Sequence, residues 1–136
     1  MKFLDYKVLK STFSLTTDIQ PNRNYKISPK VNCNIRKGTD KLVCTFNVDL
    51  QKKDEPIPFE FSILAVGTFE VEINEDPSEL AVKVAETVFP FVRSSIASLT
   101  QMANIPAYVL PLLDMEELLK KGKTQTIPTP ISTTLN

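Results

Sequence analysis

An uncharged, apolar segment from Asn104 to Leu113 lies between two helical patterns and constrains the fold more than any other part of the chain. Full burial of one large aliphatic side chain contributes about 1.5–3 kcal/mol. The aliphatic residues of the segment together carry roughly 10 kcal/mol, an upper bound, whereas whole domains are stable by about 5–15 kcal/mol. The segment must therefore cover its own sheet, a sister subunit or another polypeptide. These aliphatic residues are Ile105, Val109, Leu110, Leu112 and Leu113.

Length and composition indicate a single globular domain without net charge. The chain has 136 residues, 42% of them hydrophobic, and its 16 basic side chains balance 16 acidic ones. Nucleic-acid-binding proteins usually show a basic face, so no nucleic-acid partner is predicted. Asp5 and Lys7 interrupt any signal-peptide core, and no apolar run approaches the ~20 residues that span a bilayer. We therefore predict a cytoplasmic protein that does not insert into membranes.

Alternating apolar and polar residues predict the strands of an antiparallel sheet. A turn signal at Lys37–Asp40 joins two of these strands into a hairpin. In the last strand segment the odd-numbered residues face inward as far as Ile73. Leu64 and Val66 make its other face apolar too, which indicates either a second covered face or one exposed apolar pair. The predicted strand segments are 8–15, 31–36, 42–51 and 57–73.

Both cysteines lie at inward-facing positions of the predicted hairpin. If the hairpin is symmetric, Cys33 faces Cys44 across it. In the cytosol two such thiols are expected to be reduced, small core side chains. A cross-strand redox pair is the alternative.

Two capping patterns predict a long helix and a short one. Asp76 followed by Pro77 begins the long helix, and Pro90 should kink or divide it because proline lacks an amide donor. A second cap at Asp114 begins the short helix, which ends near Gly122. The sequence thus predicts one domain over residues 1–122 and a flexible, Thr/Pro-rich tail over residues 123–136.

The residues needed for common catalytic sites are missing or scattered. The chain has no histidine, its three glycines lie far apart, and its two cysteines lack zinc-ligand spacing. We therefore predict no catalytic residue, no cofactor and no metal, and not an enzyme. A cation held by acidic residues is the weaker interpretation of Glu70, Glu72, Glu75 and Asp76, since a solvated strand end followed by a helix cap accounts for them. A small-ligand carrier is the weakest alternative.

Several short motifs, in order, resemble the SecB protein-export chaperones. The stretch FPFVR from Phe89 to Arg93 is similar to that family's Phe-Pro-Tyr-Ala-Arg in its long helix. Segments 8–15, 29–31 and 59–69 resemble its first, second and fourth strands. The apolar segment with Pro106 and Pro111, followed by an acidic-capped helix, resembles its ending. The similarity covers most of residues 3–121.

The resemblance implies an α+β fold, with a four-stranded antiparallel sheet packed against one long kinked helix and one short C-terminal helix. It also implies a homo-oligomer, a dimer of dimers in which the long helices pack between the sheets. The small and polar residues of the long helix suit such a contact. The residues expected at this interface are Phe91, Arg93, Ser94, Ser98 and Gln101.

The resemblance further implies grooves that hold unfolded or secretory polypeptide without ATP. The apolar segment and the short helix would line these grooves. The residues expected to bind clients are Ile105, Tyr108, Val109, Leu110, Leu112, Met115, Leu118 and Leu119.

The chain departs from the family at the positions that contact the export motor SecA. The family uses acidic residues there, and the aligned residues are Thr12, Thr16 and Ser62. Known export members are also acidic overall, whereas this chain is neutral. Coupling to SecA is therefore not predicted. The alternatives are a dedicated chaperone or adaptor for one partner, such as a toxin–antitoxin pair, and a scaffold of the same fold without an export role.

Overall fold

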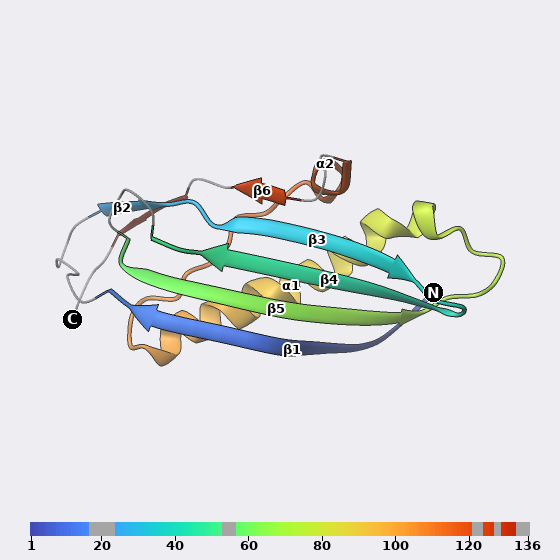
Figure 1. Cartoon of the computed structure of the whole chain (residues 1–136), viewed down its shortest axis with the longest axis horizontal. Coiled ribbons are helices and arrows are strands. Elements are labelled where there is room, and N and C mark those ends of the chain that lie inside the picture. Colours follow the sequence, from blue (N-terminus) through green and yellow to red (C-terminus); the bar gives the residue numbers. More distant parts are fainter. Residues whose placement is uncertain (17–23, 53–56, 121–123, 127–128, 133–136) are drawn as a thin grey trace.

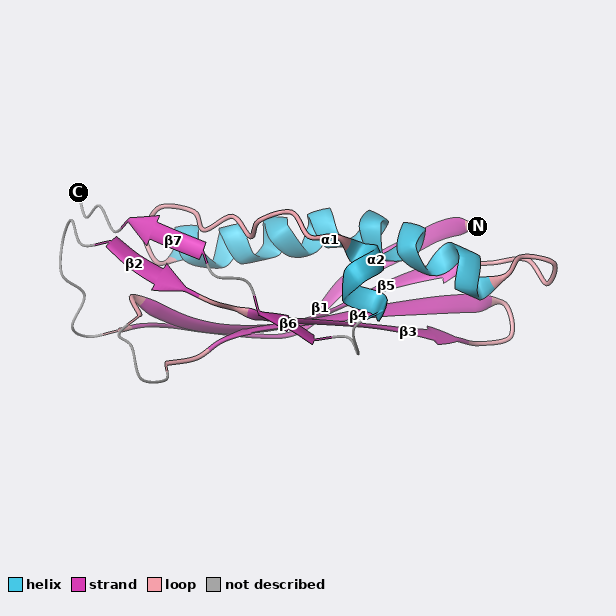
Figure 2. Cartoon of the chain, turned by 90° about the horizontal axis from the view of Figure 1, so that it is seen from above, coloured by secondary structure: helices cyan, strands magenta, loops and turns pink. Residues whose placement is uncertain are grey.

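The computed structural model describes residues 1–16, 24–52, 57–120, 124–126 and 129–132. They form two layers, an antiparallel sheet and a helical layer that covers one of its faces (Figures 1 and 2). The strand order of the large sheet is β1-β5-β4-β3-β6. Its four long strands are β1 (Lys2–Leu15), β3 (Lys30–Lys37), β4 (Lys41–Leu50) and β5 (Phe59–Glu70).

The four long strands confirm the predicted sheet, and alternation explains which face each side chain takes. Along β5 the odd-numbered residues from Phe59 to Phe69 are buried beneath the helical layer, and the even-numbered residues between them are half-buried on the outer face. The inward pattern stops sooner than predicted. Ile73 is 95% exposed because β5 ends at Glu70 and the chain turns at Ile73. The structure also contains β2 (Asn24–Ile27), which the alternation pattern does not predict.

The β3–β4 hairpin forms as predicted, but its register is not the symmetric one. Cys33 pairs with Phe46 rather than with Cys44, so the expectation that the cysteines lie directly opposite is wrong. The turn sets this register, and in it the Gly38 N–H donates to the Lys41 carbonyl oxygen at 2.7 Å. A shift of two residues keeps both cysteines on the same face. They are buried free thiols, with their Sγ atoms 3.7 Å apart.

Strand β1 forms one edge of the sheet and is irregular at two places. Its register with β5 shifts at Leu4 and again at Leu9. At each of these positions β1 contains one residue that has no partner on β5, because the residues on either side of it pair with consecutive residues of β5. Such bulges bend a strand and increase its twist. Regular pairing with β5 resumes over residues 5–8 and 10–15.

The helical layer consists mainly of α1 (Pro77–Met102), one helix of 26 residues. It begins where predicted, with Asp76 Oδ1 accepting the Ser78 N–H at 3.0 Å and Pro77 in the first turn, where no donor is needed. Pro90 lies inside the helix and does not divide it. Pro90 is exposed, and so is Glu86, the residue whose carbonyl loses its helical donor.

The middle of α1 lies very close to the sheet at Gly67. A Cβ atom added to Gly67 would lie 2.4 Å from Cγ2 of Val88, which is impossible without movement. Glycine at this point of β5 therefore allows the helix to approach. The buried face of α1 that uses this approach contains Val84, Ala85, Val88, Phe89, Val92, Ile96 and Thr100.

After α1 come α2 (Met115–Lys120) and two strands that the sequence does not predict. Strand β6 (Thr124–Thr126) pairs with β3, and β7 (Thr129–Ser132) pairs with β2. Residues 121–123, 127–128 and 133–136 lie outside the described part, so the domain limit at 122 and the flexibility of the tail stay predictions. Among the residues placed by the structure, no helix is long and apolar enough to cross a bilayer.

Candidate functional site

The apolar segment becomes a connection, here called the crossover (residues 103–114), that runs from the end of α1 back along the helical layer to α2 (Figure 2). Its direction is set at Asn104, which has a φ of 61°. Asparagine tolerates this left-handed conformation better than most residues. The Asn104 N–H donates to the Gln101 carbonyl oxygen at 3.0 Å. The helix therefore ends here and the chain reverses.

Two side chains of α1 fix the backbone of the crossover. The Tyr108 N–H donates to Thr100 Oγ1 at 2.8 Å, and Arg93 Nε donates to the Leu110 carbonyl oxygen at 2.7 Å. Thr100 is fully buried, and its hydroxyl donates to the Ala97 carbonyl oxygen at 2.8 Å, so it bridges the helix and the crossover. Non-helical backbone needs such partners when it is buried. The crossover is thus held in one conformation.

The predicted client-binding residues divide between core and surface. Four are core side chains, at most 5% exposed: Tyr108, Leu110, Met115 and Leu118. Two are partly buried against that core: Ile105 and Leu119. Two are exposed, Val109 by 54% and Leu112 by 78%. In this conformation a second chain can contact the side chains of Val109 and Leu112. It can reach only part of Ile105 and Leu119, and it cannot reach the four core side chains.

One exposed residue beside the crossover was missed from the sequence. Met102, the last residue of α1, is 81% exposed. The helical pattern does indicate that Met102 is exposed, because Met102 falls outside the apolar face defined by Val92, Ile96 and Leu99. Methionine is flexible and polarisable, and is often used at adaptable binding surfaces.

The second end of the crossover is fixed by α2. Asp114 Oδ1 accepts the N–H groups of Glu116 at 3.0 Å and Glu117 at 3.3 Å, which confirms the predicted cap. The buried side of α2 packs into the core beside β3. The exposed ion pair between Lys120 and Glu116, at 3.6 Å, adds little stability.

The residues predicted at the oligomer interface lie on the exposed or half-buried side of α1. Phe91 is 43% exposed and its ring centroid lies 5.3 Å from that of Tyr6 on β1. Arg93 holds the crossover of its own chain. Ser94, Ser98 and Gln101 are exposed. Contact of these residues with a second copy stays a prediction.

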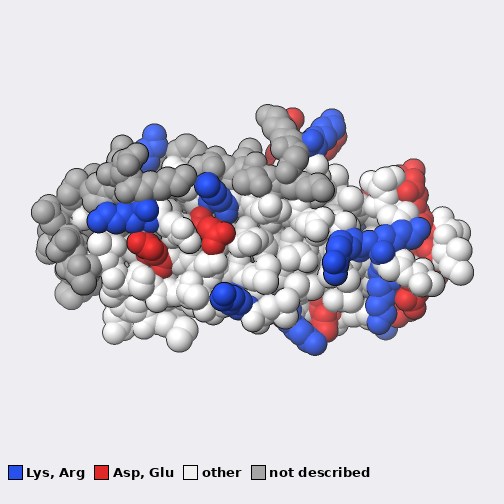
Figure 3. Space-filling model, in the orientation of Figure 1, with Lys and Arg blue, Asp and Glu red and all other residues white. Residues whose placement is uncertain are grey.

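The outer face of the sheet, away from α1, carries the positions aligned with the family's motor-binding acids. Thr12 on β1 pairs with Ser62 on β5, and the Thr16 hydroxyl donates to the Ile57 carbonyl oxygen at 2.6 Å. Figure 3 shows this face, with broad uncharged areas between separate groups of charged side chains. The three positions themselves carry no charge, although Asp49 on β4 pairs with Ser62 and Glu60 lies two residues from Ser62 on the same face.

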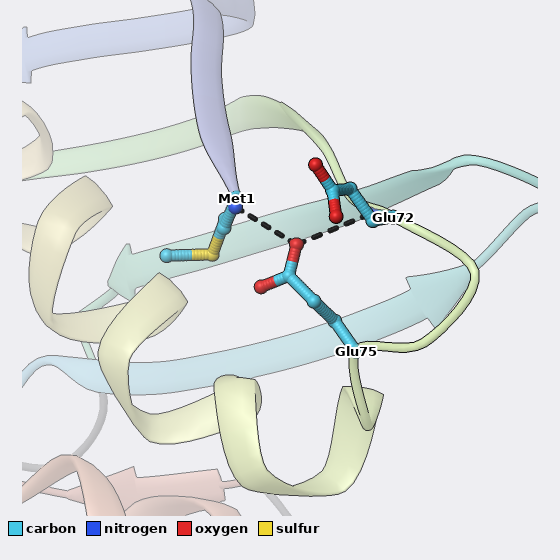
Figure 4. A network of polar contacts seen from close by, with 3 residues as sticks. All are labelled: Met1, Glu72 and Glu75. Atoms are coloured by element: carbon cyan, nitrogen blue, oxygen red, sulfur yellow. Dashed lines mark hydrogen bonds and ion pairs between the residues drawn. The ribbon is translucent and has the colours of Figure 1, made fainter.

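The acidic residues after β5 form a polar network (Figure 4). Glu75 Oε1 accepts from the N-terminal ammonium of Met1 at 2.8 Å and from the Glu72 N–H at 3.1 Å. The hydrogen bond from the N-terminus, supported by that from Glu72, holds the pKa of Glu75 below its usual value. Within the described ranges no group of acidic, cysteine or histidine side chains is arranged to hold a metal ion.

Two partly or fully buried groups have raised pKa values. The hydrogen bond with Cys33, together with burial, raises the pKa of the Cys44 thiol. Burial also raises the pKa of Tyr6, although its 2.9 Å hydrogen bond with the Ser95 hydroxyl opposes this. A thiol kept protonated in this way is a poor nucleophile and a poor metal ligand. The Cys44 thiol is therefore a weak nucleophile at neutral pH.

Comparison with known proteins gives a relative by sequence and similar solved structures. The chain is 26% identical to the protein-export protein SecB of Orientia tsutsugamushi (strain Boryong) over 110 residues, 76% of this chain and 68% of that relative. It superimposes with a TM-score of 0.67 on a SecB-like chaperone of Mycobacterium tuberculosis in complex with an antitoxin peptide, at 13% identity over 82% of this chain and 90% of that one. No family model matches the chain. Neither relative is named as an enzyme, which agrees with the prediction for this chain.

Proposed function

The chain is SecB-like in both sequence and fold, and on this basis we propose that it is an ATP-independent chaperone that holds unfolded or secretory polypeptides. The observation that carries the proposal is the pair Val109 and Leu112, which are 54% and 78% exposed on a fixed backbone. Such side chains can be buried only by a partner. Any unfolded chain offers apolar side chains for this burial, so neither nucleotide nor cofactor is required.

The proposal includes a cytoplasmic location and a homo-oligomer. The exposed residues of α1, Ser94, Ser98 and Gln101, would lie between copies in a dimer of dimers. Coupling to SecA is not part of the proposal, because Thr12, Thr16 and Ser62 provide no charge for it.

A dedicated chaperone for one partner is the second candidate. It is favoured by one finding, that the structural neighbour is bound to a peptide from an antitoxin. A dedicated chaperone would capture one protein in stoichiometric amount and would leave the aggregation of unrelated denatured proteins unchanged. A holdase would reduce that aggregation.

The test is to replace Leu112 by Asp and to measure aggregation of a chemically denatured reference protein after dilution. We expect Leu112→Asp to weaken client binding on the order of tenfold, since one exposed Leu contributes about 1.5–3 kcal/mol when buried by a partner. Its unfolding midpoint should stay close to that of the unchanged chain because the side chain is exposed. Leu110→Asp is not informative, because Leu110 is fully buried and the variant would unfold.

Ile73→Asp is the matched control, since it makes the same change from apolar to acidic at a residue that is 95% exposed and distant in sequence from the crossover. It should suppress aggregation as the unchanged chain does. Equal activity of Leu112→Asp and Ile73→Asp would remove the crossover from the proposal. No effect of the unchanged chain at molar excess would refute the holdase function itself.

A further inference from the structure

The chain's own C-terminal residues pair with the edges of two strands: β3, at the edge of the large sheet, and β2, with which they form a separate two-stranded sheet. These two strand edges are together called the β2–β3 edge. In β6, Thr124, Gln125 and Thr126 pair antiparallel with Asn32, Val31 and Lys30. In β7, Thr129 to Ser132 pair antiparallel with Ile27 to Asn24. The opposite edge, β1, has no such cover among the described strands. The fold therefore shows that the β2–β3 edge accepts an extended strand.

The strands of this edge share the core with the crossover and α2. Ile27 on β2 and Val31 on β3 are fully buried in the same core cluster as Leu110 of the crossover and Leu118 of α2. Helix α2 lies against β3. In both cartoon views the β2–β7 ribbon lies at the end of the molecule where the crossover begins (Figures 1 and 2). A strand added to β3 would thus lie at the edge against which α2 packs, and α2 begins where the crossover ends.

The covering residues are chemically similar to a generic unfolded segment. From Thr124 to Asn136 the sequence TQTIPTPISTTLN contains no charged residue. Pairing through backbone groups makes few demands on side chains, so many sequences can replace it. The ladder is also short, with three pairs to β3 and four to β2, and Pro130, opposite Lys26, has no N–H to donate. These features suit an occupant that can be displaced.

We propose that the β2–β3 edge is a second client-binding surface, which takes an extended, uncharged polypeptide strand by antiparallel pairing, and that strands β6 and β7 are its resting occupant. This inference rests on the proposed chaperone function and adds its regulation. A client strand must displace β6 and β7, whose tether gives them an effective concentration on the order of millimolar. If the tail fills the edge nine-tenths of the time, its removal should raise client affinity roughly tenfold.

The first experiment uses the full chain and reduced, carboxymethylated α-lactalbumin as a permanently unfolded client. Amide hydrogen exchange is followed by mass spectrometry with and without saturating client. We expect residues 124–126 and 129–132 to lose protection when the client binds, while the β3–β4 pairing keeps its protection. Unchanged protection of these two strands at proven saturation would overturn the proposal and leave the chaperone function intact.

The second experiment compares client affinity in the full chain, in a chain truncated after Gly122, and in a full-length variant with residues 124–132 replaced by Gly and Ser. Both altered chains should bind the client about tenfold more tightly, and a free peptide of residues 123–136 should compete with the client on the truncated chain. Equal affinity of all three forms, each shown to be folded by circular dichroism, would overturn the proposal. If no form binds the client, the proposed function fails and the proposal fails with it.

Discussion

At the scale of single residues, Gly67 decides how closely α1 approaches the sheet. We expect Gly67→Ala to lower the free energy of unfolding by about 1–3 kcal/mol, because the new Cβ would overlap the stiff, fully buried Val88. Adding Val88→Ala should recover part of the loss. Urea unfolding of the variants measures both effects.

Gly38 provides the control for this experiment. A Cβ atom at Gly38 would lie 3.6 Å from the Lys41 carbonyl oxygen, an ordinary contact. Gly38→Ala should therefore leave the unfolding midpoint nearly unchanged or raise it slightly. Equal losses at the two glycines would contradict the steric explanation.

Glu75 makes the stability of the fold depend on pH in the acidic range. Its pKa is lowered in the folded state by the hydrogen bonds from the Met1 ammonium and the Glu72 N–H. A lowered folded pKa contributes stability that is present above the ordinary carboxyl pKa of 4.5 and is lost as pH falls through the folded value. The unfolding midpoint of the unchanged chain should thus exceed that of Glu75→Gln at pH 7, and the two should converge in acid. A constant difference between pH 7 and pH 2 would contradict this.

At the scale of elements, the crossover depends on Thr100. Thr100→Val keeps the shape of the side chain but leaves the buried Tyr108 N–H without its acceptor, which should lower the free energy of unfolding by about 1–3 kcal/mol. Hydrogen exchange at the Tyr108 amide should also become faster. Thr87→Val is the control, since the Thr87 hydroxyl donates to the exposed Lys83 carbonyl oxygen at 2.8 Å, and its change should stay within about 0.5 kcal/mol. Equal effects of the two variants would show that Thr100 does not hold the crossover.

The elements differ in how well the sequence predicts them. The long strands and both helix starts follow from local signals, namely alternation along β4 and β5 and the caps at Asp76 and Asp114. Strands β2, β6 and β7 do not, because each has three or four residues and depends on pairing with a distant segment. Which residues of the crossover are buried and which are exposed likewise cannot be predicted from local sequence. Leu110 and Leu112 have the same chemistry, and their contrasting burial depends on where Thr100 and Arg93 hold the backbone.

At the scale of the whole molecule, the proposed assembly depends on the exposed side of α1. If copies pack through this helix, native mass spectrometry should give four times the 15.3 kDa of one chain. Ser98→Arg should then shift the population to smaller species, because a long charged side chain cannot fit a close helix contact. Ile73→Arg, in an exposed turn, should leave the mass unchanged. A monomer for the unchanged chain would refute the helix-packed assembly.

The two bulges of β1 affect what can happen between molecules at high concentration. A straight fourteen-residue border of unpaired peptide groups would invite copy after copy to join into a fibril. A strand from another copy would meet one bulge at Leu9 and another at Leu4. The longest stretch of β1 without a bulge is therefore the six residues from Lys10 to Leu15. Removing Leu9 would straighten that border, and slow growth of thioflavin-positive aggregates would be the expected cost.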